Sequence, residues 1–215
     1  NTLVEKYGPL YLIEAILESG EQLYKEEQKG HGPDFSHYNW SRAQRVHLNN
    51  LSQLKTITKT IYFGLGGVQD AYDADIILHE YGHRVEEALL FDSLDNSGEP
   101  SAVSEAVADY LSASFFGNDC IGEWDSIAYS SLGCLRKLQN NKKYPIDLVY
   151  EVHEDSLILS GALWKIRKEL TNNGINTELV KKFDSIVLHS LYFLRPQSNF
   201  MEAGRAIVQA DKMLT

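Results

Sequence analysis

Apolar residues recur at every third or fourth position through most of the chain, and this spacing predicts helices rather than strands. An amphipathic helix is expected at about residues 9–29, before a Gly-His-Gly-Pro stretch that would end it. From about residue 71 the pattern is almost entirely helical, with loops marked by Gly, Asn, Asp and Pro. The helices predicted there are 73–91, 100–116, 124–139, 154–171, 177–194 and 199–213.

Two short segments, 45–50 and 58–64, carry the β-branched and aromatic residues typical of strands. The sequence therefore predicts an α+β fold, with a small sheet-plus-helix lobe at about 1–92 and an all-helical lobe at about 93–215. No internal repeat or long flexible linker interrupts the chain. The whole chain, 1–215, is thus expected to form one domain with a cleft between its lobes.

Composition and charge narrow the class of protein. The chain has 215 residues, of which 43% are hydrophobic and 11% aromatic, as in a globular protein. Its net charge of −10 and pI near 5.1 argue against nucleic acid as a partner, because phosphates would be repelled. No apolar run approaches the ~20 residues that a membrane span needs. The sequence begins at Asn1 rather than Met, which predicts a processed portion of a longer protein, and it does not indicate an oligomeric state.

The two cysteines, Cys120 and Cys134, have thirteen residues between them. This spacing allows a disulfide without establishing one, because the sequence does not give the distance between the two Cα atoms. A disulfide and two free buried thiols both stay open. Neither cysteine belongs to a CxxC pair, so a thiolate zinc site is not expected.

The stretch His79-Glu80-Tyr81-Gly82-His83 carries the strongest chemical signal. Residues four apart share one face of a helix, so His79 and His83 could direct imidazole nitrogens at one metal ion. Glu80 lies about 100° around the helix from His79, which suits a general base acting on a metal-activated water better than a third ligand. The same residues could also be two ordinary histidines on one helix, so a third ligand is needed to decide.

A third ligand is offered by the predicted helix 100–116, where Glu105 and Asp109 are four residues apart. Glu105 follows His83 by 22 residues, which is enough for a helix end, a loop and a return pass. Alanines on this helix would let it pack closely against the HEYGH helix. Asp109 could then accept the free N–H of a ligand histidine and fix its orientation.

The segments "HEYGH" and "GEPSAVSEAVADYL" together resemble the gluzincin metallopeptidases, especially the thermolysin and fungalysin families. The resemblance implies a zincin catalytic fold with one catalytic zinc ion. Its ligands would be His79, His83 and Glu105, with Glu80 as the general base and Asp109 behind a ligand histidine. A metzincin site would need HExxHxxGxxH spacing, but position 86 is Glu and position 89 is Leu.

Two further residues are assigned by the same resemblance. The stretch "VHEDSLILSGALWKI" is similar to a segment whose histidine stabilises the oxyanion, which points to His153. Asp147, six residues earlier, could orient the ring of His153. Related peptidases place a substrate-binding arginine upstream of this histidine, where it hydrogen-bonds a substrate carbonyl. Arg136 is the candidate, and a surface arginine is the alternative.

The chain departs from the thermolysin family in two respects. The loop "LFDSLDNSGEPS" lacks the tyrosine that usually shares the oxyanion role, so more of that role would fall to His153 and the metal. A dense set of calcium ligands is not evident either. Five acids could contribute oxygens to calcium but are expected to be solvated surface residues: Asp73, Asp75, Asp119, Glu123 and Asp125.

The expected function is that of a zinc metalloendopeptidase that binds an extended peptide or protein substrate along an edge strand near residues 48–64. By family resemblance the protein would be secreted or extracytoplasmic. The alternative is a catalytically silent zincin-fold module that binds a partner without hydrolysis. A complete set of ligands and base speaks against that alternative, because a pseudoenzyme usually loses one of them.

Overall fold

The computed structural model describes residues 37–39, 60–63, 68–90, 93–129, 133–172 and 177–214. The chain divides into two compact units, Asn1–Tyr72 and Asp73–Thr215. This division lies earlier in the chain than the lobe boundary near residue 92 that the sequence predicts. The helix that carries HEYGH therefore belongs to the same unit as Glu105.

In the described part of the first unit, two short antiparallel strands pair, β1 (His37–Asn39) and β2 (Thr60–Tyr62). A 3-10 helix, η1 (Asp70–Tyr72), ends the unit. The strand β2 confirms a strand within the predicted segment 58–64. Other predictions for this unit, the helix 9–29, the strand 45–50 and most of the peptide-binding edge, fall outside the described residues.

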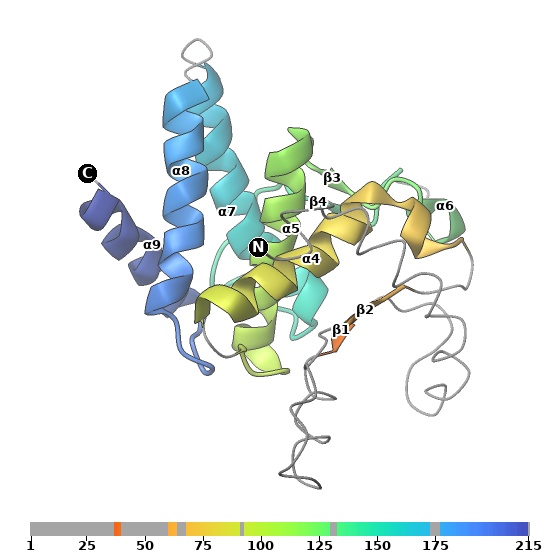
Figure 1. The fold of residues 1–215 in the computed structure, drawn as a ribbon, viewed down its shortest axis with the longest axis horizontal. Helices are drawn as coiled ribbons and strands as arrows, with labels where there is room; N and C mark the ends of the chain where they lie inside the picture. The colour runs from red at the N-terminus through yellow and green to blue at the C-terminus, as the bar shows by residue number, and fades with distance from the viewer. Residues whose placement is uncertain are drawn as a thin grey trace, which may run out of the picture. The chain divides into compact units, whose positions relative to one another are not determined.

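The second unit is mainly helical (Figure 1). Its longer helices are α4 (Ala74–Leu90), α5 (Gly98–Phe116), α7 (Val152–Asn172), α8 (Thr177–Ser190) and α9 (Phe200–Leu214). Shorter elements are β3 (Cys120–Ile121), α6 (Ser126–Tyr129), β4 (Arg136–Lys137) and the 3-10 helix η2 (Leu191–Phe193). Of the helices described, none combines the length and the apolar character that crossing a membrane would require.

Five of the predicted helices are confirmed to within a few residues, as α4, α5, α7, α8 and α9. The predicted helix 124–139 is wrong, because among the described residues of this range helix is limited to α6, and β4 follows. Gly133 adopts a left-handed conformation with φ of 77°, which interrupts a helix, and Cys134 is joined to Cys120 by a disulfide. β4 then pairs with β3, so this unit is not all-helical.

Helix α5 lies at the centre of the second unit and packs against both α4 and α7 (Figure 1). Its apolar residues are buried on several sides, and the main core cluster joins them to α7, α8 and α9. The fully buried Tyr110 adds a polar tie, because its hydroxyl donates to Asp184 Oδ1 on α8 at 2.6 Å. These contacts hold α5 in place and leave one of its faces to meet α4.

Helices α4 and α5 meet most closely at Gly82. A Cβ atom added to Gly82 would lie 2.8 Å from the Cα atom of Ala108 and 3.1 Å from its Cβ atom. Real side chains do not tolerate a contact that short, so only glycine fits at this crossing. His79 and His83 lie on either side of Gly82, and Glu105 and Asp109 on either side of Ala108. The crossing therefore sets how closely these two pairs approach.

Gly82→Ala is expected to destabilise the protein, although alanine is intrinsically the better helix former by about 1 kcal/mol. The new methyl group would push against the backbone of Ala108, and such overpacking costs about 1–3 kcal/mol. The measurement is the free energy of unfolding in urea. Gly204→Ala on α9 is the matched control, because a Cβ there meets nothing within 4 Å. Equal stability of the two variants would contradict the tight crossing.

Candidate metal centre

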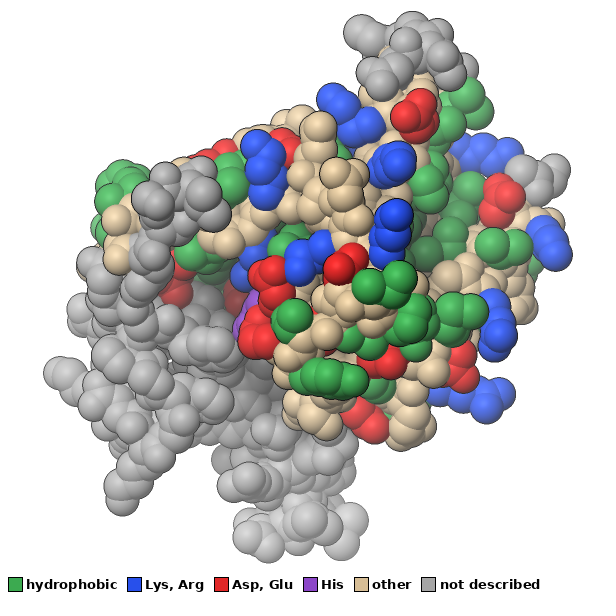
Figure 2. Space-filling view, turned by 180° about the vertical axis from the view of Figure 1, so that it is seen from behind, with side chains coloured by type: hydrophobic (Ala, Val, Ile, Leu, Met, Phe, Trp, Pro, Cys, Tyr) green, Lys and Arg blue, Asp and Glu red, His purple; other side chains and the backbone are tan. Residues whose placement is uncertain are grey.

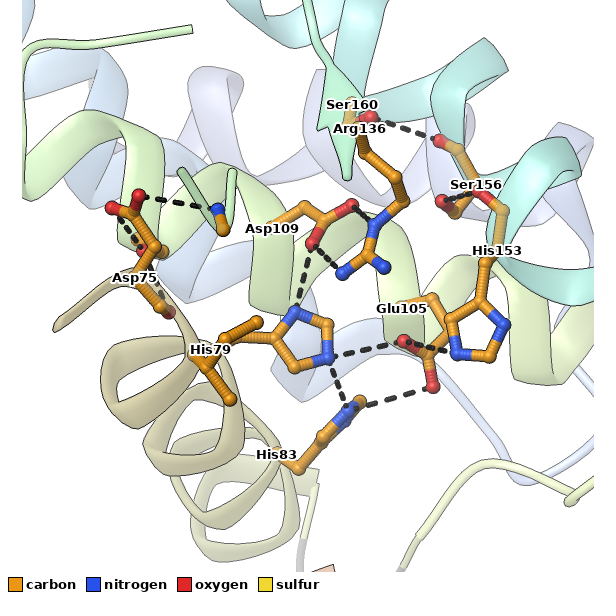
Figure 3. Close-up of polar contacts among 12 residues, drawn as sticks. Asp75, His79, His83, Glu105, Asp109, Arg136, His153, Ser156 and Ser160 are labelled. Atoms are coloured by element: carbon orange, nitrogen blue, oxygen red, sulfur yellow. Dashed lines mark hydrogen bonds and ion pairs between the residues drawn. The ribbon is translucent and has the colours of Figure 1, made fainter. Parts of the chain in front are cut away.

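Two histidines on α4 and two polar residues on α5 form the base of the site (Figure 3). The Nδ1 atom of His79 lies 2.8 Å from Oδ1 of Asp109, and the Nδ1 atom of His83 lies 3.0 Å from the hydroxyl of Ser104. Each imidazole is therefore anchored through the same ring nitrogen. The two Nε2 atoms point toward each other, 3.2 Å apart.

Glu105 completes a group of three converging side chains. Its Oε2 lies 3.1 Å from Nε2 of His79, and its Oε1 lies 3.6 Å from Nε2 of His83. One ligand atom from each of the three residues lies within 4.8 Å of the other two. This is the ligand set that the sequence predicts, and the group could hold a metal ion.

The donor set fits a metal ion. An ionised Asp109 only accepts hydrogen bonds, so the ring N–H of His79 belongs on Nδ1, and the hydroxyl of Ser104 can accept an Nδ1–H from His83 in the same way. Each Nε2 atom then carries a lone pair toward the other and toward the Glu105 carboxylate. Three electron-rich atoms that converge in this way need a cation or a proton between them.

The pKa values of His79 and Glu105 both indicate that the site favours a bound positive charge. Burial alone would lower the pKa of His79, but hydrogen bonds to Asp109 and Glu105 and their negative charges raise it to about 10. Burial of Glu105 would raise its pKa, yet the charges of His83, His79 and His153 hold it well below the usual range. These interactions favour positive charge within the group, which either a proton or a metal cation would supply.

Asp109 is held from behind by Arg136. The Arg136 guanidinium donates from Nε to Oδ2 at 2.8 Å and from Nη2 to Oδ1 at 2.7 Å. Asp109 is completely buried, which alone would raise its pKa, but Arg136 and His79 lower the pKa to about 2. The carboxylate therefore stays ionised and keeps His79 in one orientation.

The position of Arg136 differs from the predicted one. Arg136 lies on β4 rather than on a helix, with only 13% of its side chain exposed, so it is not a surface arginine. β4 is placed by its pairing with β3 and by the Cys120–Cys134 disulfide, whose Cα atoms are 5.6 Å apart. The disulfide also decides between the two states that the sequence left open for these cysteines.

His153 lies at the start of α7 and reaches the same group (Figure 3). Its Nε2 lies 3.6 Å from Oε2 of Glu105, and its Nδ1 lies 3.0 Å from Oε1 of Glu151. The suggestion that Asp147 orients this ring is wrong. The carboxylate of Asp147 accepts the backbone N–H of Lys143 at 2.7 Å, and Glu151 takes the place beside His153.

Glu80 is buried on α4 directly after His79, with 4% of its surface exposed. Burial would lower the pKa of Arg136, but the charges of Asp109, Glu105 and Glu80 together raise it. Glu80 is thus close enough to Arg136 for its charge to act on the guanidinium. In the space-filling view only a small part of a histidine is visible, beside a group of acidic side chains (Figure 2).

Two residues near the ligands had no role in the sequence-based prediction. Ser104 precedes Glu105 and contacts His83, and Glu86 is a buried acid on α4 with 3% of its surface exposed. The sequence could have indicated Glu86, because positions 79, 83 and 86 share one face of a helix. An acid on that inward face is unusual for a packing position.

Three of the five acids that the sequence predicts to be solvated surface residues are buried instead. Asp73, Asp75 and Asp125 are all at least nine-tenths buried. Asp73 accepts the backbone N–H groups of Asp75, Trp124 and Asp125, each at 2.9 Å. These carboxylates tie the start of α4 to the segment after β3. Among the described residues, the one group that could hold a metal ion is His79, His83 and Glu105. The buried acids near α4 therefore do not indicate a calcium site.

Comparison with known proteins adds no assignment, since the chain matches no protein-family model and no curated protein. The geometry of the site therefore carries the functional argument.

Asp75→Asn is expected to change how stability depends on pH. Burial, a hydrogen bond with Glu123 and the charges of Glu123 and Asp73 raise the pKa of Asp75 from 3.8 to about 7. A raised carboxyl pKa in the folded state means that the stabilisation is complete below about pH 4 and is lost as the pH rises through about 7. Asparagine stays neutral, so the variant should lose less stability over this interval.

The measurement is the thermal unfolding midpoint of the metal-free protein between about pH 4 and pH 8. The variant's advantage over the wild type should grow as the pH rises. Parallel curves for the two proteins would show that Asp75 does not titrate in this window.

Proposed function

We propose that this chain is a zinc-dependent metalloendopeptidase of the gluzincin type, with a zincin fold like those of the thermolysin and fungalysin families. The observation that carries the proposal is the convergence of His79, His83 and Glu105, with ligand atoms within 4.8 Å of one another. Two imidazoles and one carboxylate are a donor set typical of catalytic zinc in peptidases. Glu80 follows His79 directly on α4, and His153 reaches Glu105, which supports the roles of base and oxyanion donor that the resemblance assigns to them.

His79, His83 and Glu105 would hold the ion, and zinc, when bound, supplies a water of lowered pKa and polarises the substrate carbonyl. The carboxylate of Glu80 accepts the proton as a water attacks the peptide carbonyl, and then delivers it to the leaving amine. Glu151 accepts the Nδ1–H of His153, so Nε2 of this imidazole is the atom directed at the reacting group. In its protonated form, with an N–H on both ring nitrogens, His153 donates from Nε2 to the oxygen on which negative charge develops.

Arg136 keeps the substrate role that the resemblance assigns, alongside its contact with Asp109. Its Nε and Nη2 groups are bound to the Asp109 carboxylate. A substrate carbonyl would therefore have to accept one of the remaining N–H groups, which lie on Nη1 and on Nη2. The double use fits a guanidinium, whose planar fork has five N–H donors.

A secreted or extracytoplasmic location is part of the same proposal. The Cys120–Cys134 disulfide supports it, because disulfides persist mainly in oxidising compartments.

The first prediction from this function separates the ligands from the base. The wild type should bind one zinc ion per chain, and His79→Ala or His83→Ala should remove it, because two remaining ligands do not retain the ion. Glu105→Gln should weaken zinc binding. Glu80→Gln should keep the zinc and abolish the cleavage of casein, because it removes the base alone. The measurements are metal content after gel filtration and casein hydrolysis.

If Glu80→Gln and Glu105→Gln behave alike, the division between base and ligand is wrong. A wild type that holds zinc without cleaving casein would instead favour the silent binding module.

The second prediction concerns His153→Ala. If the imidazole acts on the oxyanion, its contribution appears only in the transition state. The variant should retain zinc and a similar KM, while kcat falls about 10²–10³-fold, the usual loss for one oxyanion donor. Steady-state kinetics on a peptide substrate give both constants. His189→Ala is the control, since that exposed histidine hydrogen-bonds to the Ser185 carbonyl of its own helix, α8, and its ring contacts Tyr192. Wild-type kcat in His153→Ala would exclude the oxyanion role.

A further inference from the structure

Glu86 is a buried acid that the proposed chemistry does not use. It lies on α4, with 3% of its surface exposed. Burial raises its pKa, while the positive charge of His83 and hydrogen bonds from the Ser104 hydroxyl and the Leu94 backbone N–H act in the opposite direction. Its Oε2 atom is buried without a hydrogen-bond partner in the part of the chain that the structure describes.

Fold stability explains this acid only in part, through the hydrogen bond that its carboxylate accepts from the Leu94 backbone N–H. Its other carboxyl oxygen is buried without a partner among the described residues, which costs free energy on folding. A methionine is of similar length and would remove that cost, but it would also remove the acceptor of the Leu94 N–H. The reason for the carboxyl of Glu86 must therefore lie in what it contacts.

Ser104 connects Glu86 to the metal centre. Its hydroxyl lies 3.0 Å from Nδ1 of His83 and also hydrogen-bonds to the Glu86 carboxylate. A hydroxyl has one hydrogen to donate and lone pairs with which to accept. When Glu86 accepts that hydrogen, the oxygen of Ser104 is left to accept the Nδ1–H of His83. The lone pair of His83 then lies on Nε2, the atom that faces His79 and Glu105.

We infer that Glu86 is a positioning residue of the metal centre, which fixes the tautomer and orientation of His83 through the hydroxyl of Ser104. The inference rests on the metal site of the proposed function. It gives each ligand histidine its own buried carboxylate, since Asp109 contacts His79 directly and Glu86 reaches His83 through one hydroxyl. Loss of such a partner typically weakens metal affinity about 10–100-fold.

The test is the zinc affinity of the whole chain, measured by competition with a chromophoric chelator at neutral pH. Glu86→Met and Ser104→Ala should each weaken zinc binding about 10–100-fold. The double variant should be no weaker than Ser104→Ala alone, because both changes break the same chain of hydrogen bonds. Glu86→Gln keeps an acceptor oxygen without the charge, so its loss should be smaller than that of Glu86→Met.

Two further measurements distinguish positioning from a purely structural role. Metal-free Glu86→Gln keeps an acceptor oxygen for the Leu94 backbone N–H, so it should unfold at about the wild-type temperature, and its loss of zinc affinity is then not a loss of fold. With Co²⁺ in place of zinc, the visible absorption bands should shift, because a reoriented His83 changes the ligand geometry. Asp75→Asn is the matched control. It removes a buried acid of the same helix that contacts Ser112 and Gly122, so zinc affinity should not change.

Unchanged zinc affinity in Glu86→Met would overturn the inference, and so would additive losses in the double variant. A fall in unfolding temperature together with an unshifted Co²⁺ spectrum would make Glu86 structural only. If Glu86→Met does not fold, the isosteric Glu86→Gln decides by the same measurements. A wild type that binds zinc but cleaves no peptide would overturn the proposed function and leave this inference standing.

Discussion

The contact between Gly82 and Ala108 determines where the ligand atoms of the site lie. Because a glycine meets a small residue at this crossing, α4 and α5 approach until a Cβ atom would no longer fit between them. The separations of 2.8 Å between His79 and Asp109 and of 3.1 Å between His79 and Glu105 follow from that backbone distance. The site is therefore built on two rigid helices, the arrangement that holds functional groups most accurately.

The ligand histidine His79 contacts the carboxylate of Asp109, which in turn contacts the guanidinium of Arg136. Asp109 would be costly to bury alone, and Arg136 offsets that cost with two hydrogen bonds of ideal length. Ser104 places a neutral hydroxyl at the corresponding position behind His83. The two histidines thus differ in their surroundings: the pKa of His79 is raised to about 10, whereas burial and the charge of His79 lower that of His83.

Local spacing explains which features could be predicted from the sequence. Helix periodicity gives most helix bounds, and the four-residue spacing of the two histidines and of Glu105 and Asp109 places each pair on one face of its helix. The predictions that were wrong concern residues whose positions depend on contacts between distant segments of the chain. Arg136 was expected on a helix, but its place is decided by a strand pairing and a disulfide that no periodicity records. The burial of the acids at the start of α4 depends likewise on a segment about fifty residues away, whose backbone amides they accept.

The disulfide has a consequence for a centre that contains no sulfur ligand. It closes the loop that delivers Arg136, with a sequence separation of 14 residues. In the chain-entropy model, closing a loop of about 15 residues destabilises the unfolded chain by about 3 kcal/mol. When the thiols are reduced, that constraint is absent, and ordering the guanidinium behind Asp109 carries the full conformational entropy of an open loop. The redox potential of the surroundings therefore affects the free energy needed to order Arg136 behind Asp109, and with it the stability of the metal centre.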